Sequence, residues 1–364
     1  MHIPDGYLSP ATCAAGYAVA VPTLALASRR VSAVVTTRNV PRLALFAALA
    51  FVVMMFNVPI PDGTTAHAVG AVVIAIALGP WAAMIAVAVA LLFQALLFGD
   101  GGVLAYGVNV TNMAILMPLV GVGVYRLVAG RSPLDARRRV VAAALGGYAG
   151  INAAALATGI ELGIQPDLFH TASGVPLYSP YHLAQAVPAM LLAHLTVAGF
   201  AEAVLTAGVL AYLQRADLAS LVPAHRGIPL HAEGTGAAEA GGRGGRLTPG
   251  RVAAGFMVVM VLLTPLGLLA PGGAFGESAP QGLDLHALGL SAVPAGLEKY
   301  NGFWSHTLLG GYGFASGDHA TAAYLLSAVV GIVVVGAVVY AIGRLVRAVS
   351  TRSGSSEKGE RAHV

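Results

Sequence analysis

Long apolar stretches alternate with short polar ones along the chain, and their lengths predict membrane-spanning helices. The hydrocarbon core of a bilayer is roughly 30 Å thick, which a helix of about 20 apolar residues crosses. Seven stretches occupy the first 213 residues, at 10–28, 41–57, 66–79, 80–98, 103–129, 137–160 and 187–213. Only the helix-breaking pair Gly79-Pro80 separates the third from the fourth. With two more at 252–270 and 321–343, the pattern predicts nine spans and an all-α integral membrane protein.

Polar segments divide the spans into two groups. Residues 214–250 contain scattered arginines and the run HAEGTGAAEAGGRGGR, which has too few apolar residues to form a core. We therefore expect a flexible cytoplasmic linker between a seven-helix bundle at 1–213 and a two-helix module at 251–345. Within the module, the Gly- and Pro-rich residues 271–320 form an outer loop, and residues 346–364 form a cytoplasmic tail.

The composition favours a membrane protein over a soluble one. The 364 residues are 57% hydrophobic and 10% charged, whereas soluble proteins carry about 25% charged residues. The net charge of +4 does not indicate a nucleic-acid partner, because the basic residues lie between apolar segments. The lipid bilayer is therefore expected to surround the chain. The start, MHIPDGYLSP, lacks the basic region of a signal peptide, so we expect it to stay on the chain. Met1 should stay as well, because the aminopeptidase that removes the initiator methionine needs a small second residue and His2 is bulky.

The positions of the basic residues predict the orientation of the chain. Lys and Arg accumulate in cytoplasmic loops, and consecutive loops alternate between the two sides of the membrane. Of the 20 basic residues, Lys299 alone falls on the opposite side from the rest when nine spans are assumed. This predicts a multi-pass protein of the bacterial inner (cell) membrane, with the N-terminus outside and the C-terminus in the cytoplasm. The N-terminus, the loop that holds His67 and residues 271–320 then share the outer side.

The first two residues offer three nitrogen donors for a metal ion. These are the amine of Met1, the amide nitrogen of His2 after deprotonation, and the imidazole of His2. Such a planar set suits Ni²⁺ or Cu²⁺ better than tetrahedral Zn²⁺ and needs one more nitrogen, which His67 could supply. Pro4, Asp5 and Gly6 would turn the segment back toward the membrane. The competing interpretations are a disordered N-terminal tail and a hydrogen-bonded interface histidine.

Four segments together resemble a known family. They are MHIPDGYLSP, VPIPDGTTAHAVG, GPWAAMIAVAVALLFQALLFGDGGVLAYGVNVTNMA and AHLTVAGFAEAVLTAGVL. Over about residues 1–213 they resemble the CbiM/NikM family, the substrate-capture subunit of nickel and cobalt energy-coupling-factor transporters. The resemblance implies a metal site made of Met1, His2 and His67, with Ni²⁺ or Co²⁺ as the transported substrate and no organic cofactor. As partners it implies a transmembrane coupling (T) protein and two ABC-type ATPase subunits.

The C-terminal pair of spans resembles the accessory module (CbiN/PDGLE type) that is often fused to these subunits. The family signature PDGLE reads Pro294-Ala295-Gly296-Leu297-Glu298 here, so the aspartate is absent. The neighbouring loop carries metal-ligand residue types, which indicate either a relay that concentrates metal or simply a polar loop: Asp284, His286, His306, Asp318 and His319.

Polar residues inside the predicted spans are costly and mark candidate functional positions. Glu202 and His194, in the seventh span, either face a partner or form hydrogen bonds between helices. Gln94, Asn109 and Asn112 either orient the ligating histidines or bond neighbouring helices. The sequence contains no G-x-x-x-x-G-K-[ST] phosphate loop and no H-E-x-x-H motif, so we expect a transporter subunit rather than an enzyme. The alternative is a self-sufficient ion-coupled divalent metal carrier or channel.

Overall fold

The computed structural model describes all residues except 32–38, 61–63, 232–248, 271–272 and 361–364. The α-helices have these bounds: α1 Pro10–Val31, α2 Val40–Met54, α3 Ala71–Leu78, α4 Pro80–Phe93, α5 Tyr106–Asn109, α6 Met117–Ala129, α7 Arg137–Gly163, α8 Gln165–Leu168, α9 Leu183–Ala193, α10 Gly199–Ala216, α11 Pro249–Leu263, α12 Ala295–Tyr300 and α13 Ala320–Glu360. The shorter helical segments are π-helical at Gln94–Phe98, Val110–Leu116 and His194–Ala198, and 3-10 at Leu218–Ala224, Thr264–Leu269, Pro280–Gly282 and Gly310–Tyr312. Strands β1 (Val58–Ile60) and β2 (Thr64–Ala66) pair as an antiparallel hairpin.

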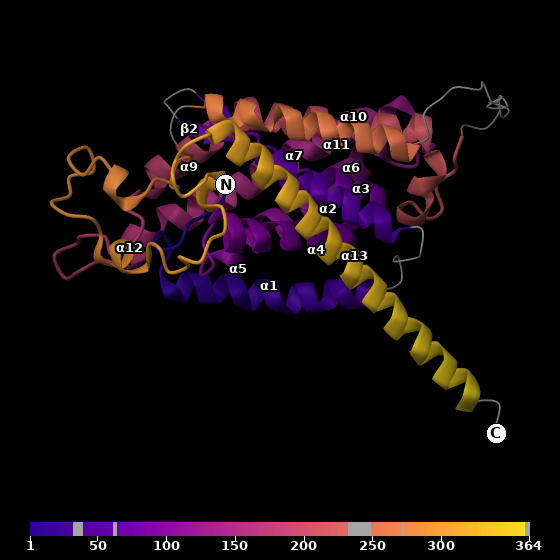
Figure 1. The fold of residues 1–364 in the computed structure, drawn as a ribbon, viewed down its shortest axis with the longest axis horizontal. Coiled ribbons are helices and arrows are strands. Elements are labelled where there is room, and N and C mark those ends of the chain that lie inside the picture. The colour runs from indigo at the N-terminus through magenta and orange to yellow at the C-terminus, as the bar shows by residue number, and fades with distance from the viewer. Residues whose placement is uncertain (32–38, 61–63, 232–248, 271–272, 361–364) are drawn as a thin grey trace.

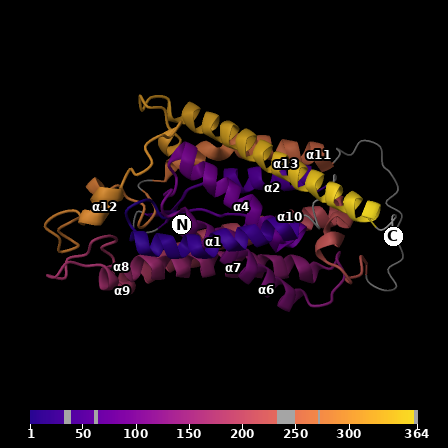
Figure 2. The ribbon, with the colours of Figure 1, turned by 90° about the horizontal axis from the view of Figure 1, so that it is seen from below.

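The long helices lie side by side along the long axis of the molecule (Figures 1 and 2). Within the described ranges, seven helical stretches are long and apolar enough to cross a membrane: Pro10–Val31, Pro80–Phe98, Tyr106–Ala129, Arg137–Leu168, Leu183–Ala216, Gly250–Leu269 and Ala320–Leu345. Helix α2 is apolar but shorter. The prediction of an all-α membrane protein is confirmed. The two strands, β1 and β2, form only a short hairpin of three residues each.

The structure differs from the predicted third span at 66–79. There α3 has only eight residues, about 12 Å of helix, and the chain before it is strand and irregular backbone. The reason is Glu202 on α10, whose Oε2 accepts the N–H groups of Val69 and Gly70 at 2.8 and 2.9 Å. Because this carboxylate satisfies those N–H groups, the backbone need not be helical there. The break between α3 and α4 lies at Gly79, with φ +93°, as predicted.

Each of three spanning helices contains one of the π-helical segments. A π-helical turn inserts an extra residue into a helix and often lies at a functional site. Gln94 and His194 are the first residues of their segments, and Asn112 lies within the third. Three of the polar positions that the sequence singled out therefore coincide with local departures from α-helical geometry.

The two C-terminal spans pack against α2. Gly331 on α13 leaves room for the ring of Phe51, with which a Cβ at this position would clash. The hydroxyl of Tyr324 donates to the carbonyl of Met55 at 2.7 Å. Of the expected linker, residues 232–248 lie outside the described residues, and part of the remainder is the 3-10 helix Leu218–Ala224. The division into two domains at the predicted boundaries stays a prediction.

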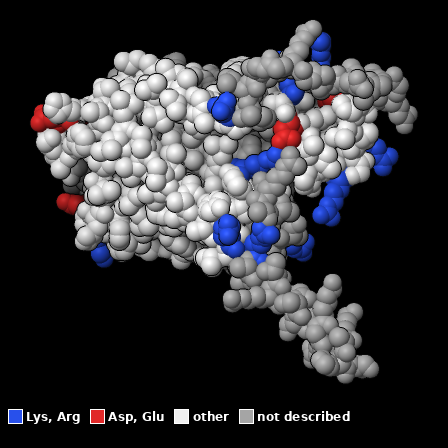
Figure 3. Space-filling view, turned by 45° about the vertical axis from the view of Figure 1, so that its right-hand side comes forward, with Lys and Arg blue, Asp and Glu red and all other residues white. Residues whose placement is uncertain are grey.

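The two ends of the bundle differ in charge. In the space-filling view, most visible Lys and Arg side chains lie toward the end where α13 leaves the bundle (Figure 3). The opposite end, where α12 and its flanking loops lie (Figure 1), carries Asp and Glu. This asymmetry agrees with the pattern of basic loops along the sequence.

Candidate metal centre

The N-terminal segment is buried inside the bundle rather than free. Met1, His2 and Ile3 are only 2%, 3% and 1% exposed, so the disordered-tail interpretation is wrong. Asn109, at the end of α5, holds the backbone beside His2 with a reciprocal pair of hydrogen bonds. Its Oδ1 accepts the N–H of Ile3 at 2.9 Å, and its Nδ2 donates to the Ile3 carbonyl at 3.0 Å. The first three residues are therefore fixed by a spanning helix.

The turn at Asp5 and Gly6 brings the chain back to the helices. The Asp5 carboxylate accepts the backbone N–H groups of residues 103–105, at distances of 2.8 to 3.2 Å. Burial raises the pKa of this carboxyl group, and the three N–H groups oppose that rise. Gly6 has φ +93°, and a Cβ there would lie 2.7 Å from the carbonyl oxygen of Leu297. Both residues thus fix the turn that the sequence predicted.

The imidazoles of His2 and His67 meet in the buried interior. Their ring centroids are 4.9 Å apart with an interplanar angle of 28°, and His67 Nε2 lies 3.2 Å from His2 Nδ1. His67 Nδ1 lies 3.0 Å from the Ala68 carbonyl oxygen, so this nitrogen donates and Nε2 carries a lone pair. His2 Nδ1 also lies 3.2 Å from Asp100 Oδ1. Both neighbours are acceptors, so in the metal-free structure the network assigns the proton to His2 Nδ1, and this proton must leave before that nitrogen can bind a metal.

This arrangement fits a metal ion between the two rings. Metal–nitrogen bonds of about 2 Å place two adjacent donors about 2.8 Å apart, close to the observed 3.2 Å. His67 lies outside the spanning helices; burial, and then the positive charge of the amino terminus, lower its pKa well below the ordinary value. Its imidazole is therefore neutral at pH 7, which ligation requires. His2 Nε2 is buried without a hydrogen-bond partner.

Side chains alone do not complete a metal site. Within the described part of the chain, no group of three or more His, Cys, Asp or Glu side chains is arranged to hold a metal ion. Two imidazoles need further donors, and the nearest candidates by sequence are the Met1 amine and the His2 amide. The amine now forms an ion pair with Glu277, 3.1 Å from Oε1. The amine must leave this ion pair before it can bind a metal.

The other polar positions in the spans have separate roles. Asn109 lies beside the site, because it bonds the backbone of Ile3. Gln94 lies near it, because its Nε2 is 3.1 Å from the hydroxyl of Tyr312, which contacts Asp100. Asn112 instead bonds α7, donating to Thr158 Oγ1 at 3.2 Å. His194 is buried: its Nδ1 lies 2.7 Å from the Met190 carbonyl oxygen, and its Nε2 has no hydrogen-bond partner.

Three residues near the site were missed by sequence reasoning: Asp100, Glu277 and Tyr312. Asp100 stands in the run Phe98-Gly-Asp-Gly-Gly, where an acidic residue directly follows an apolar stretch and could have been noticed. Nothing local links Glu277 or Tyr312 to the N-terminus, because each contact joins residues more than 200 positions apart.

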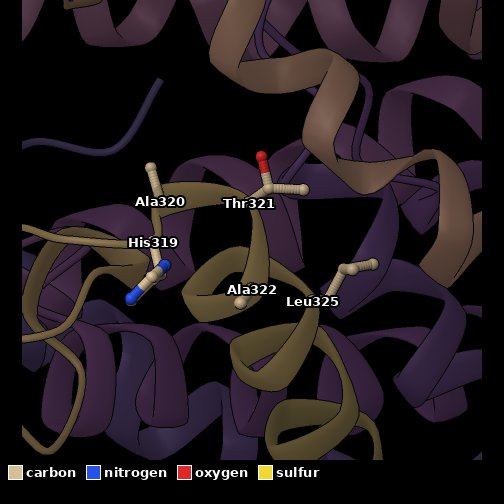
Figure 4. A pocket seen from close by; sticks show the side chains of 5 residues that line it. All are labelled: His319, Ala320, Thr321, Ala322 and Leu325. Carbon is tan, nitrogen blue, oxygen red and sulfur yellow. The ribbon is translucent and has the colours of Figure 1, made fainter.

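The metal-ligand residue types of the C-terminal loop are not gathered into a site. All five are exposed: Asp284, His286, His306, Asp318 and His319. His319 lines a pocket of about 410 Å³ at the start of α13, with Ala320, Thr321, Ala322 and Leu325 (Figure 4). Apart from His319, these lining residues offer no good metal donor. The loop geometry therefore gives no support to a metal relay.

These features define a multi-span helical membrane protein with a buried histidine pair at its amino terminus. Residues 2–219 match the family model CbiM, described as the cobalt uptake substrate-specific transmembrane region. The chain belongs to this family and is a component of nickel or cobalt transport.

Relatives extend the similarity over the whole chain. The fused nickel transport protein NikMN of Rhodobacter capsulatus is 44% identical over 97% of this chain and 100% of its own. The probable fused nickel transport protein LarMN of Lactiplantibacillus plantarum is 42% identical over 92% and 95%. A solved structure described as a truncated transition metal transporter is 58% identical, covers 59% of this chain and 99% of its own, and has a TM-score of 0.56.

Proposed function

We propose that this chain captures Ni²⁺ or Co²⁺ outside the cell membrane with Met1, His2 and His67. The observation that carries the proposal is the buried pair of ring nitrogens, 3.2 Å apart, at the end of a chain segment that Asn109 and Asp5 hold in place. The names of the relatives, which are nickel and cobalt transport proteins, support these two ions as substrates.

The donor set explains a preference for these ions. The Met1 amine, the His2 amide nitrogen and His2 Nδ1 form two adjacent chelate rings, and His67 Nε2 occupies the fourth corner of the plane. Zn²⁺ gains little from a plane of nitrogens, and Mg²⁺ prefers oxygen donors. The site therefore takes Ni²⁺ by preference and Co²⁺ as an alternative substrate.

Delivery to the cytoplasm requires energy from other subunits. The sequence has no phosphate loop, so the chain acts as the substrate-binding subunit of an energy-coupling-factor transporter, with a transmembrane coupling protein and two ATPase subunits as partners. In this proposal the N-terminus faces outward and the C-terminus lies in the cytoplasm of a bacterial cell. The concentration of basic side chains at the end where α13 leaves the bundle supports this orientation.

A two-residue extension before Met1 tests the metal site. The extension displaces the amine from chelating register, so we expect Ni²⁺ binding by the purified chain to weaken more than the roughly 10–100-fold that loss of an outer-shell group costs. Isothermal titration measures the affinity, and size-exclusion chromatography checks the fold. His286→Ala, at an exposed histidine, is the matched control and should bind normally. An extended chain that binds one Ni²⁺ as tightly as the unmodified chain would refute the chelate.

A second candidate function is a self-sufficient ion-coupled carrier. Glu202 is the buried acid that could favour such a carrier, but its carboxylate already accepts hydrogen bonds from two backbone N–H groups. Metal uptake by cells that lack the ATPase subunits separates the two functions. Strong accumulation by this chain alone would favour the carrier.

A further inference from the structure

An apolar groove runs along α10, away from the candidate metal centre. Its volume is about 960 Å³, near the upper end of the roughly 300–1,000 Å³ that ligand pockets occupy. Residues of α2, α3 and α11 form the other walls, and none of the candidate metal ligands lines it. The lining residues of α10 recur at helical spacing and so form one face of that helix: 200–201, 204–205, 208–209 and 212–213.

The length and lining of the groove suit an acyl chain. Between Phe200 and Leu213, α10 rises by about 20 Å, whereas one leaflet of hydrocarbon is roughly 15 Å deep. Phe200 and Val204 face the groove and are still 64% and 72% exposed. Gly208 leaves further room, because a Cβ there would meet no atom within 4 Å. Since α10 belongs to a membrane-spanning stretch, the occupant must be apolar along this length.

One end of the groove is polar and charged. Arg42, near the start of α2, forms an ion pair there with Asp217, which directly follows α10. Ser220 also lines this end. Arg215 and Arg251 each lie within two residues of lining positions, in the last turn of α10 and near the start of α11. The three arginines outnumber the aspartate, so this group carries a net positive charge.

We propose that this groove binds an anionic phospholipid, with an acyl chain along α10 and the phosphate at Arg42. The N–H fork of a guanidinium suits a phosphate, because it offers two parallel hydrogen bonds. Basic pockets between spanning helices on the cytoplasmic side bind anionic headgroups, and this end is cytoplasmic in the orientation proposed above. The lipid would then fill the space between the bundle and α11. An apolar helix of a partner protein would fit the walls but would not need the arginines.

Two variants test the two parts of the groove separately. Gly208→Leu places a side chain in the apolar part, where there is space for it. Its matched control is Gly123→Leu on α6, where a Cβ also meets no atom within 4 Å and which does not line the groove. Arg42→Gln removes a charge from the polar end. Its matched control is Arg137→Gln, at an exposed arginine that begins α7.

The test measures lipid binding by the full-length chain after detergent has removed its lipid. The chain is titrated with phosphatidylglycerol, or with phosphatidylethanolamine that has the same acyl chains, and native mass spectrometry counts the bound lipid. We expect the unmodified chain to bind phosphatidylglycerol more tightly, and Gly208→Leu to lose this binding. Arg42→Gln should bind phosphatidylglycerol about fivefold more weakly, which is the contribution of one basic residue to the attraction of an anionic lipid. Both control variants should behave as the unmodified chain does.

Several results would overturn the inference. Equal affinity of the unmodified chain for the two lipids, or normal phosphatidylglycerol binding by Arg42→Gln, would show that the polar end does not recognise the headgroup. Normal phosphatidylglycerol binding by Gly208→Leu would place the lipid elsewhere. If Gly208→Leu keeps its lipid but no longer co-purifies with a co-expressed coupling protein, the groove is a protein interface instead. Thermal unfolding and Ni²⁺ binding of each variant should be normal, which separates loss of lipid from loss of fold.

Discussion

Residues 1–9 and the region between α11 and α13 both have largely irregular backbone, yet they present their polar side chains in opposite ways. Met1, His2 and Ile3 are buried, and side chains from the helices take up the polar backbone groups beside them. The C-terminal region has more metal-ligand residue types, but its histidines are exposed. Metal-ligand residues therefore make a candidate site only where the fold fixes them in a dry, hydrogen-bonded frame.

The strongest test of this contrast replaces one histidine in each region. His67→Ala removes a ligand from the buried pair, so Ni²⁺ binding should fall by more than about 100-fold. His319→Ala, in the exposed pocket at the start of α13 (Figure 4), should leave binding unchanged. Titration of both purified variants with Ni²⁺ gives the comparison. A loss with His319→Ala instead would move the site to the C-terminal region.

The two regions also predict different responses to pH. A chelate that includes the Met1 amine and the His2 amide must displace protons. Its affinity for Ni²⁺ should therefore fall about tenfold, for each proton released, when the pH is lowered by one unit. A site made of histidine side chains alone displaces no amide proton, so its affinity should level off once the imidazoles are neutral. We therefore expect Ni²⁺ affinity to keep rising above pH 7, with a diamagnetic, square-planar spectrum. A paramagnetic six-coordinate centre whose affinity levels off above pH 7 would contradict the N-terminal chelate.

A milder test loosens the frame without touching a ligand. Asn109→Leu removes both hydrogen bonds to Ile3, so the first residues should become less ordered and Ni²⁺ affinity should fall by about 10-fold or more. Unfolding free energy should fall by about 1–3 kcal/mol, because buried backbone groups lose their partner. Asn152→Leu, on α7, is the control: its Nδ2 bonds the Tyr148 carbonyl within the same helix, so Ni²⁺ affinity should not change. Equal affinities for the two variants would show that the frame does not matter.

The sequence by itself determined the membrane class, most of the spans and the break at Gly79. These features are local, because a bilayer requires long apolar helices and because Gly followed by Pro ends a helix wherever it occurs. It also indicated the turn at Asp5 and Gly6. The candidate ligands Met1 and His2 follow from their place at the chain end. His67 was a candidate from its place at the start of a predicted span, and the family resemblance strengthened it.

Only the tertiary structure decided how these residues are held. Helix α3 is short because Glu202, 132 positions from Gly70, accepts its N-terminal N–H groups, so no local pattern of residues 66–79 could predict it. The link from Tyr312 through Asp100 to His2 likewise joins three distant segments. Hydrogen-bond partners of this kind depend on which helix faces meet, and the apolar periodicity of a membrane helix does not specify that, because lipid and protein interior are both apolar.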